Sequence, residues 1–273
     1  MKTVLTVAGS DCSGGAGIQA DLKTFLANGV YGMSVITSLT AQNTAAVRQV
    51  LNVPDDFLSE QLEAVLSDIK PDAVKIGMLT SPEAVEIIAG KLVEYKVRNI
   101  VTDTIVKATA GNVFMENETI SALKKYLFPI STLITPNIPE AEQLLNVSIN
   151  TANDKLNAAK KLYEIYGCNV LIKGGHGYGN CNDILYAEGK SYIFQSEKID
   201  NKNTHGTGCT LSSACAANLA KGYDLSESVQ LAKEYITGAI NAKLNLGKGR
   251  GPLDHGYNLK SKYIKRRTCC EKL

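Results

Sequence analysis

In the stretch Asn203–Ala214 (NTHGTGCTLSSA), a helical pattern directly follows two glycines and a series of small residues. Leu211, Cys215 and Leu219 follow at four-residue spacing, which predicts an amphipathic helix. Glycines before a helix let the backbone turn tightly and leave the first N–H groups of the helix unpaired. Those groups and the positive end of the helix dipole form an anion site. The stretch therefore predicts an anion-binding helix N-terminus.

Cys209 stands in the first turn of this predicted helix, where the helix dipole can stabilise a thiolate. Taken alone, the pattern fits a second interpretation equally well: a turn that only starts the helix, with an inert buried thiol behind it. Gly-x-Gly before a helix is common and has low specificity. The rest of the chain has to distinguish the two interpretations.

Short apolar runs alternate with helical patterns along the whole chain. The expected strands are residues 3–8, 31–39, 73–76, 99–102, 132–134, 169–172, 183–187 and 191–195. The expected helices begin after residue 17 and after residue 135, and cover 54–69, 82–95, 116–127, 151–166, 209–221 and 226–246. This alternation predicts an α/β fold with a mostly parallel central sheet and helices on both faces. We expect one domain over residues 1–260, a lid segment at 104–112 and a basic tail at 261–273.

Composition excludes several classes of protein. The formal net charge is +2, so the chain lacks the concentrated basic face by which proteins bind nucleic acid. Its 7 cysteines show no paired zinc spacing, which favours free thiols in a reducing compartment. The chain has neither a signal-peptide pattern nor an apolar run long enough to span a bilayer. We therefore expect a cytoplasmic protein without membrane or nucleic-acid partners.

Glycines and polar residues follow the predicted strands. In an open α/β sheet, ligands bind outside the carboxyl ends of the strands, so these residues should gather at one edge. They are the loop 9–17, Gln42, Met78, Asp103, Glu140 and Lys173. Carboxylates such as Asp103 and Glu140 suit Mg²⁺, and Lys173 suits a phosphate. This inventory predicts a site for a small polar molecule and a magnesium-bound polyphosphate, although the chain has no P-loop and no protein-kinase signature set.

Six motifs occur in order over nearly the whole chain. They are GSDCSGGAGIQADLKTF (9–25), SVITSLTAQNT (34–44), KIGML (75–79), TPNIPEAEQL (135–144), LIKGGH (171–176) and THGTGCTLSSA (204–214). Each is weak by itself, but together they resemble the ribokinase-type small-molecule kinases. Within these, the chain is similar to the hydroxymethylpyrimidine/phosphomethylpyrimidine kinases of thiamin biosynthesis.

The resemblance implies ATP and Mg²⁺ as cofactors and phosphoryl transfer to the hydroxymethyl group of the pyrimidine and then to its monophosphate. It also implies a homodimer. By the same resemblance, the pyrimidine pocket is lined by Gly9, Asp21, Gln42 and Met78, with Gln42 pairing to the amino-pyrimidine edge. The metal is associated with Asp103 and Glu140, and the nucleotide with Lys173 and Thr207. The anion hole is formed by Gly206, Thr207, Gly208 and Cys209, with Cys209 also taking or orienting the hydroxyl proton.

The chain departs from the family pattern at two places. Cys12 replaces the usual Pro in the first loop, and Lys107 lies in a segment that is more apolar in the family. A related group of pyridoxal kinases shares the Gly-Thr-Gly-Cys ending and often carries a lid cysteine, which this chain lacks between Cys12 and Cys168. Pyridoxal or pyridoxine kinase activity and a non-catalytic nucleotide-binding regulator therefore remain alternatives. His176 and His205 stay open between structural and functional roles.

Overall fold

The computed structural model describes residues 1–104, 116–175, 182–195 and 199–262. Lys107, His176, the expected lid from residue 105 onward and nearly all of the expected tail lie outside these residues. The strands are β1 (Thr3–Asp11), β2 (Tyr31–Gln42), β3 (Val47–Asn52), β4 (Ala73–Ile76), β5 (Ile100–Thr102), β6 (Leu133–Ile134), β7 (Asn169–Ile172), β8 (Asp183–Ala187) and β9 (Lys190–Phe194). The helices are α1 (Gly17–Ala27), α2 (Asp55–Asp68), α3 (Pro82–Glu94), α4 (Asn117–Ala122), α5 (Ile138–Leu145), α6 (Ala152–Tyr166), α7 (Thr207–Lys221) and α8 (Leu225–Asn241).

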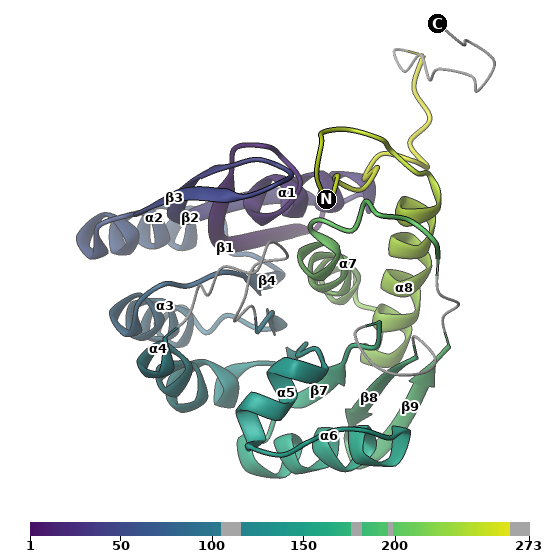
Figure 1. The fold of residues 1–273 in the computed structure, drawn as a ribbon. Coiled ribbons are helices and arrows are strands. Elements are labelled where there is room, and N and C mark those ends of the chain that lie inside the picture. Colours follow the sequence, from purple (N-terminus) through teal and green to yellow (C-terminus); the bar gives the residue numbers. More distant parts are fainter. Residues whose placement is uncertain (105–115, 176–181, 196–198, 263–273) are drawn as a thin grey trace, which may run out of the picture.

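All of these strands join one sheet in the order β3-β2-β1-β4-β5-β6-β7-β8-β9 (Figure 1). The strands from β2 to β7 in this order run parallel. The two edges are antiparallel, with β3 against β2 and the hairpin β8–β9 against β7. Parallel strands are covered on both faces, and all four residues of β4 are buried, Lys75 among them. The predicted α/β class with a mostly parallel sheet is confirmed.

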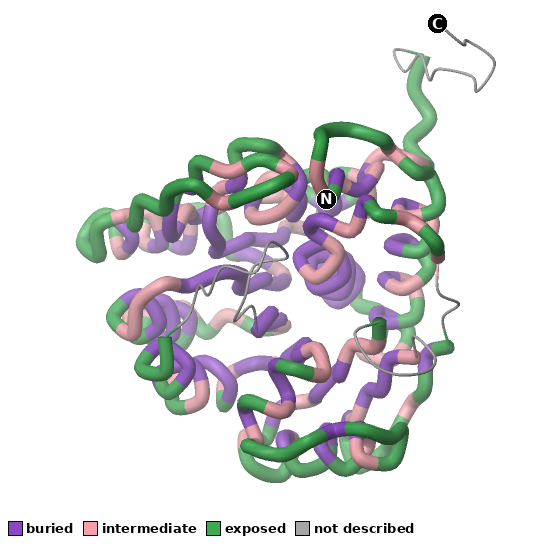
Figure 2. Tube along the Cα trace, viewed as in Figure 1, coloured by how far each residue is buried: buried purple, intermediate pink, exposed green. Residues whose placement is uncertain are grey.

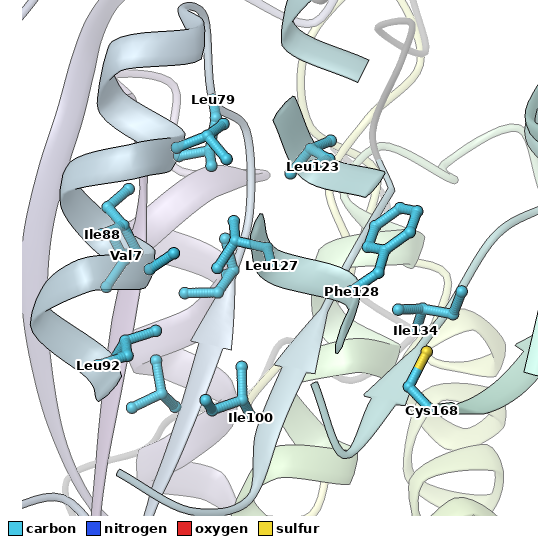
Figure 3. Packing of buried hydrophobic residues seen from close by; sticks show 14 of the residues in the cluster. Val7, Leu79, Ile88, Leu92, Ile100, Leu123, Leu127, Phe128, Ile134 and Cys168 are labelled. Atoms are coloured by element: carbon cyan, nitrogen blue, oxygen red, sulfur yellow. The ribbon is translucent and has the colours of Figure 1, made fainter. Parts of the chain in front are cut away.

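Two hydrophobic cores lie on opposite faces of the sheet. On one face, α2, α3, α5 and α6 pack through residues such as Leu62, Ile88 and Leu162, and Figure 3 shows Ile88 and Leu92 of α3 close to Val7 and Ile100 of the strands. On the other face, α1, α7 and α8 pack on the sheet and on one another. Layers of helices on both faces leave the strand ends as the place where loops from distant parts of the chain meet.

Helix α7 lies between the sheet and its neighbours α1 and α8. Every residue from Cys209 to Ala220 is buried, while Thr207 and Gly208 at the start of the helix are partly open and Lys221 at its end is exposed (Figure 2). A helix enclosed on all sides needs small side chains to pack closely, which explains the run of Ala, Ser and Cys in this stretch. The predicted helix 209–221 therefore exists, and it is the central helix of its layer.

Several boundaries differ from the sequence prediction. The first strand runs to Asp11 rather than to residue 8. The second strand runs to Gln42 rather than to residue 39 and pairs with β3, a strand that was not predicted. Five of the six residues of β3 are exposed, so it lacks the alternating apolar pattern that marks a half-buried strand. Helix α8 ends at Asn241 rather than at residue 246, since Lys243 adopts the left-handed conformation (φ 50°). The helix expected at 116–127 changes to a π-turn at Leu123–Leu127.

None of the helices in the described part of the chain is both long and apolar enough to cross a membrane.

Candidate functional site

The N-terminus of α7 meets the first glycine loop at the carboxyl edge of the sheet. Gly206, at the N-cap, has a left-handed backbone (φ 83°). A Cβ at this position would overlap the carbonyl of Gly15, so a larger residue would force the two loops apart. Gly15 and Gly206, 191 residues apart in the chain, thus bring the two glycine-rich motifs into direct backbone contact. Thr207 and Gly208 in the first turn of α7 are partly open. The Thr207 N–H donates to the Thr204 carbonyl at 3.3 Å, and the N–H groups that follow it are among those that a helix start leaves without intrahelical acceptors.

An aspartate–lysine pair stands beside this first turn. Lys173 Nζ lies 2.8 Å from Asp103 Oδ1, which also accepts a hydrogen bond from the Thr135 hydroxyl at 3.0 Å. Although burial opposes ionisation, Lys173 holds the pKa of Asp103 below its ordinary value. A Cβ on Gly208 would lie 3.3 Å from Asp103 Oδ2 and 3.5 Å from Lys173 Nζ. A carboxylate, an ammonium and a helix N-terminus therefore converge on one point.

Glu140 lies at the start of α5, on the same edge. Its carboxylate accepts from the backbone N–H of Asn137 at 2.8 Å and from the Thr104 hydroxyl at 3.0 Å, and Asn137 caps the helix in return. Burial raises the pKa of Glu140, while Lys173 lowers it and Asp103 raises it further. Among the described residues no group of three acidic, cysteine or histidine side chains could hold a metal ion. The two carboxylates fit Mg²⁺ only in the way this ion binds polyphosphates, with few protein ligands and several waters.

Cys209 is buried under the first turn of α7. Burial raises the pKa of its thiol to about 11, against the opposing effects of the Lys75 ammonium and of a hydrogen bond with the Gly17 backbone. At neutral pH the side chain is therefore a thiol. Desolvation by burial thus outweighs the stabilisation of a thiolate by the Lys75 ammonium and the Gly17 hydrogen bond.

Asp21 and Lys75 form a second ion pair, directly beneath this region. Lys75 Nζ lies 3.0 and 2.9 Å from the two carboxylate oxygens of Asp21, and neither side chain is accessible to solvent. The hydroxyls of Thr6 and Ser213 also donate to Asp21, each at 2.6 Å. The structure thus places Asp21 below the surface of the site, with its oxygens already engaged. Lys75 was missed, although a lysine within the buried run Ala73–Ile76 was a signal, since fully buried lysines are almost always paired.

Gly9 and Met78 lie together at the neighbouring strand ends. A Cβ on Gly9 would come within 2.7 Å of Met78 Cε and 2.8 Å of Ser38 Oγ, so only glycine leaves room for the methionine. The Met78 carbonyl accepts from the Thr37 hydroxyl at 2.9 Å, which fixes this turn against β2. The structure thus places Gly9 and Met78 side by side, and their role in lining a pyrimidine pocket stays a prediction.

Gln42, at the end of β2, belongs to a polar group with His205 and Asp11. Gln42 Nε2 lies 3.2 Å from His205 Nε2, which in turn lies 2.8 Å from Asp11 Oδ2. Burial opposes ionisation of Asp11, but hydrogen bonds from His205, Ser13 and Ala16 lower its pKa to about 2. Asp11 was not predicted as a site residue. Its place in the first glycine loop was the only sequence signal.

Comparison with known proteins identifies the relatives of this arrangement. Residues 11–254 match the family model described as phosphomethylpyrimidine kinase. A hydroxymethylpyrimidine/phosphomethylpyrimidine kinase of Haemophilus influenzae is 44% identical, and the match covers 93% of this chain and 97% of that protein. The thiamine biosynthesis bifunctional protein of Geobacter sulfurreducens is 49% identical over 93% of this chain, which spans about half (52%) of that longer protein.

Solved structures agree with this assignment. The phosphomethylpyrimidine kinase of Clostridium difficile superposes with a TM-score of 0.80 at 44% identity, covering 88% of this chain and 100% of that one. The pyridoxal kinase of Bacillus subtilis, solved with ADP, superposes with a TM-score of 0.87 at 39% identity, covering 94% of this chain and 98% of that one. The fold and the resemblance predicted from the six motifs are confirmed. The chain belongs to the phosphomethylpyrimidine kinase family.

Proposed function

We propose that this chain transfers the γ-phosphoryl group of ATP to the hydroxymethyl oxygen of 4-amino-5-hydroxymethyl-2-methylpyrimidine, and then phosphorylates the monophosphate. The observation that carries the proposal is the convergence of the open first turn of α7 on the Asp103–Lys173 pair. Phosphoryl transfer needs mainly positioning and the stabilisation of charge, which this arrangement supplies. The names of the curated relatives support the same reaction.

The backbone N–H groups of residues 206–209 are the proposed anion hole. They open toward the point where the transferred group gains charge, and each such donor is typically worth about 3 kcal/mol in the transition state. Lys173 adds a positive charge next to Gly208 and contacts the nucleotide phosphates, with Thr207 beside it. Magnesium, held by Asp103 and Glu140 together with phosphate oxygens and waters, would neutralise further phosphate charge.

The substrate ring is proposed to lie against Gly9 and Met78, with its amino edge toward Gln42. Asp21 lies below the surface of this pocket and supports it, because its carboxylate is enclosed by Lys75, Thr6 and Ser213. Cys209 orients the substrate hydroxyl rather than removing its proton in advance, since its pKa of about 11 keeps it a thiol at neutral pH. A primary alcohol is less acidic still, so its proton leaves only as the phosphoryl group arrives and passes to an oxygen of that group.

Turnover measurements separate this proposal from its rivals. ADP release is measured with the hydroxymethylpyrimidine, its monophosphate, pyridoxal and ribose as acceptors. We expect release with the two pyrimidines. Turnover of pyridoxal alone would establish the second candidate, a pyridoxal kinase, which the superposition with the Bacillus subtilis enzyme favours. Tight nucleotide binding without any turnover would indicate a regulator.

The homodimer implied by the resemblance remains a prediction. Light scattering after size-exclusion chromatography tests it, because a single species at twice the chain mass is expected and a monomer would contradict it.

A further inference from the structure

The polar group of Asp11, His205 and Gln42 joins three distant parts of the chain, and its hydrogen positions follow from donor and acceptor roles. Asp11 Oδ1 accepts from the backbone N–H and the hydroxyl of Ser13 at 2.9 and 2.7 Å. Asp11 Oδ2 accepts from the backbone N–H groups of Gly15 and Ala16 at 3.1 and 2.8 Å. A carboxyl group surrounded by four donors is ionised and acts only as an acceptor.

The tautomer of His205 follows from this carboxylate. Its Nε2 lies 2.8 Å from Asp11 Oδ2, and both side chains are buried. Because Asp11 has no proton to give, Nε2 of His205 must carry the hydrogen and donate it.

The orientation of the Gln42 amide follows in turn. As placed, Nε2 of Gln42 lies 3.2 Å from Nε2 of His205, which would set one N–H donor against another. The two ends of an amide have nearly the same shape, so the hydrogen-bond partners decide which end is which. Turning the amide over brings Oε1 to His205, where it shares the single Nε2 hydrogen with Asp11 Oδ2 in a three-centre hydrogen bond, and the clash between two donors is removed.

The other end of the amide fits the turned orientation as well. It lies 3.2 Å from the hydroxyl oxygen of Thr40, which is 2.9 Å from the carbonyl of Ser10. The single hydroxyl hydrogen of Thr40 goes to that carbonyl, because a carbonyl can only accept. Thr40 Oγ1 then accepts from Nε2 of Gln42, and each of these groups has a matching partner.

We propose that His205 is a positioning residue that locks the Gln42 amide in one orientation, so that the pocket accepts a 4-aminopyrimidine and rejects the corresponding 4-oxopyrimidine. This inference rests on the proposed function, in which Gln42 meets the ring. An aminopyrimidine edge presents a donor beside a ring-nitrogen acceptor, whereas the oxo edge presents an acceptor beside an N–H donor. A free amide can turn to pair with either edge, but a locked amide pairs with only one.

The experiment compares the binding of the amino and the oxo pyrimidine by calorimetry in the absence of ATP. His205→Phe removes the lock, and we expect the ratio of the two dissociation constants to fall at least about tenfold, which equals a change of about 1.4 kcal/mol. His205→Gln keeps an N–H donor and should restore most of the ratio. Thr40→Val releases the other end of the amide and should lower the ratio less.

Two further variants complete the design. His255→Phe is the matched control, because the other described buried histidine pairs with Thr210 outside this group, and the ratio should be unchanged. Gln42→Ala should weaken binding of the aminopyrimidine and abolish the preference. Suppose that Gln42→Ala abolishes the preference but neither His205→Phe nor Thr40→Val changes the ratio. The inference that His205 fixes the Gln42 amide is then overturned, while the proposed function stands. If the wild-type protein binds neither pyrimidine, both are overturned.

Discussion

Two lysine–aspartate pairs lie near the first turn of α7, and they differ in their access to solvent. In the Lys75–Asp21 pair both side chains have 0% exposure, whereas in the Lys173–Asp103 pair the lysine keeps 14%. The enclosed carboxylate is also bonded to Thr6 of β1 and Ser213 of α7. The same two residue types thus serve two purposes, since the enclosed pair joins β1, β4, α1 and α7, and the open pair faces the space where a phosphate would bind.

Breaking the enclosed pair should have the largest effect. Lys75→Met leaves the Asp21 carboxylate buried without its counter-charge, and we expect a loss of about 3–5 kcal/mol in the free energy of unfolding. Urea denaturation followed by circular dichroism measures the loss. The double variant with Asp21→Leu, which replaces the pair by apolar residues, should recover most of the stability. An unchanged midpoint in Lys75→Met would mean that the pair does not hold these elements together.

The open pair should respond in activity more than in stability. Lys173→Met removes a charge that faces the phosphates, and we expect kcat/KM for ATP to fall by about 10²–10³-fold, with a loss of stability smaller than that of Lys75→Met. Steady-state kinetics with varied ATP checks this. Lys173→Arg keeps the charge and is the control. Its kcat/KM for ATP should lie between the values of the wild type and Lys173→Met. Equal kinetics in the wild type and Lys173→Met would remove the lysine from the phosphate site.

The thiol between the two pairs should have an intermediate effect. Cys209→Ala removes a group that orients the substrate hydroxyl, so we expect kcat to fall by about ten- to a hundredfold with little change in KM. Because burial raises the pKa of the thiol to about 11, the wild type and Cys209→Ser should share the same pH profile between pH 6 and 9. A wild-type rate that keeps rising toward pH 11, and a Cys209→Ser rate that does not, would instead identify a thiolate base.

The smallest effect is expected at Asp11, outside both pairs. Its pKa of about 2 in the folded chain is below the ordinary value of 3.8, so its stabilisation is complete above that ordinary value and is lost as the pH falls toward 2. Asp11→Asn should cost about 1 kcal/mol at neutral pH, because the amide oxygen can still accept some of the hydrogen bonds, and it should flatten this acid limb of the stability curve. Ser13→Ala, which removes one hydroxyl donor, should give a smaller change in the same direction. If the wild type and Asp11→Asn lose stability in the same way as the pH falls toward 2, the lowered pKa of Asp11 is contradicted.

Local patterns predicted most of the fold. The apolar runs at β1, β4 and β7, and the Asn137–Glu140 start of α5, are read correctly because a buried strand or a helix cap involves neighbouring residues. The edge strand β3 could not be predicted, since its exposed side chains carry no alternation and its pairing with β2 depends on tertiary contacts. The end of α8 was missed for a similar reason, as one left-handed residue ends the helix.

The candidate site was predicted as a set of residue types, and the structure adds which of them meet. Strand-end reasoning brings Asp103, Glu140 and Lys173 to one edge, as the structure has them. It could not separate the enclosed Asp21–Lys75 pair from the Asp103–Lys173 pair, in which the lysine keeps 14% exposure, because Lys75 lies 54 residues away in the chain from Asp21. It also could not give the raised pKa of Cys209, which follows from burial rather than from sequence.

The contact between Gly15 and Gly206 has a consequence for how the protein is made. During synthesis the N-terminal strands leave the ribosome long before α7, so the apolar sheet face that α7 covers stays uncovered until residue 221 has emerged. Contacts between such distant residues form late and slowly, and exposed sheet surface favours aggregation in the interval. The segment that carries the proposed anion hole is therefore also needed to cover the sheet of the nascent chain, and a truncation before α7 should yield an insoluble product rather than a folded but inactive protein.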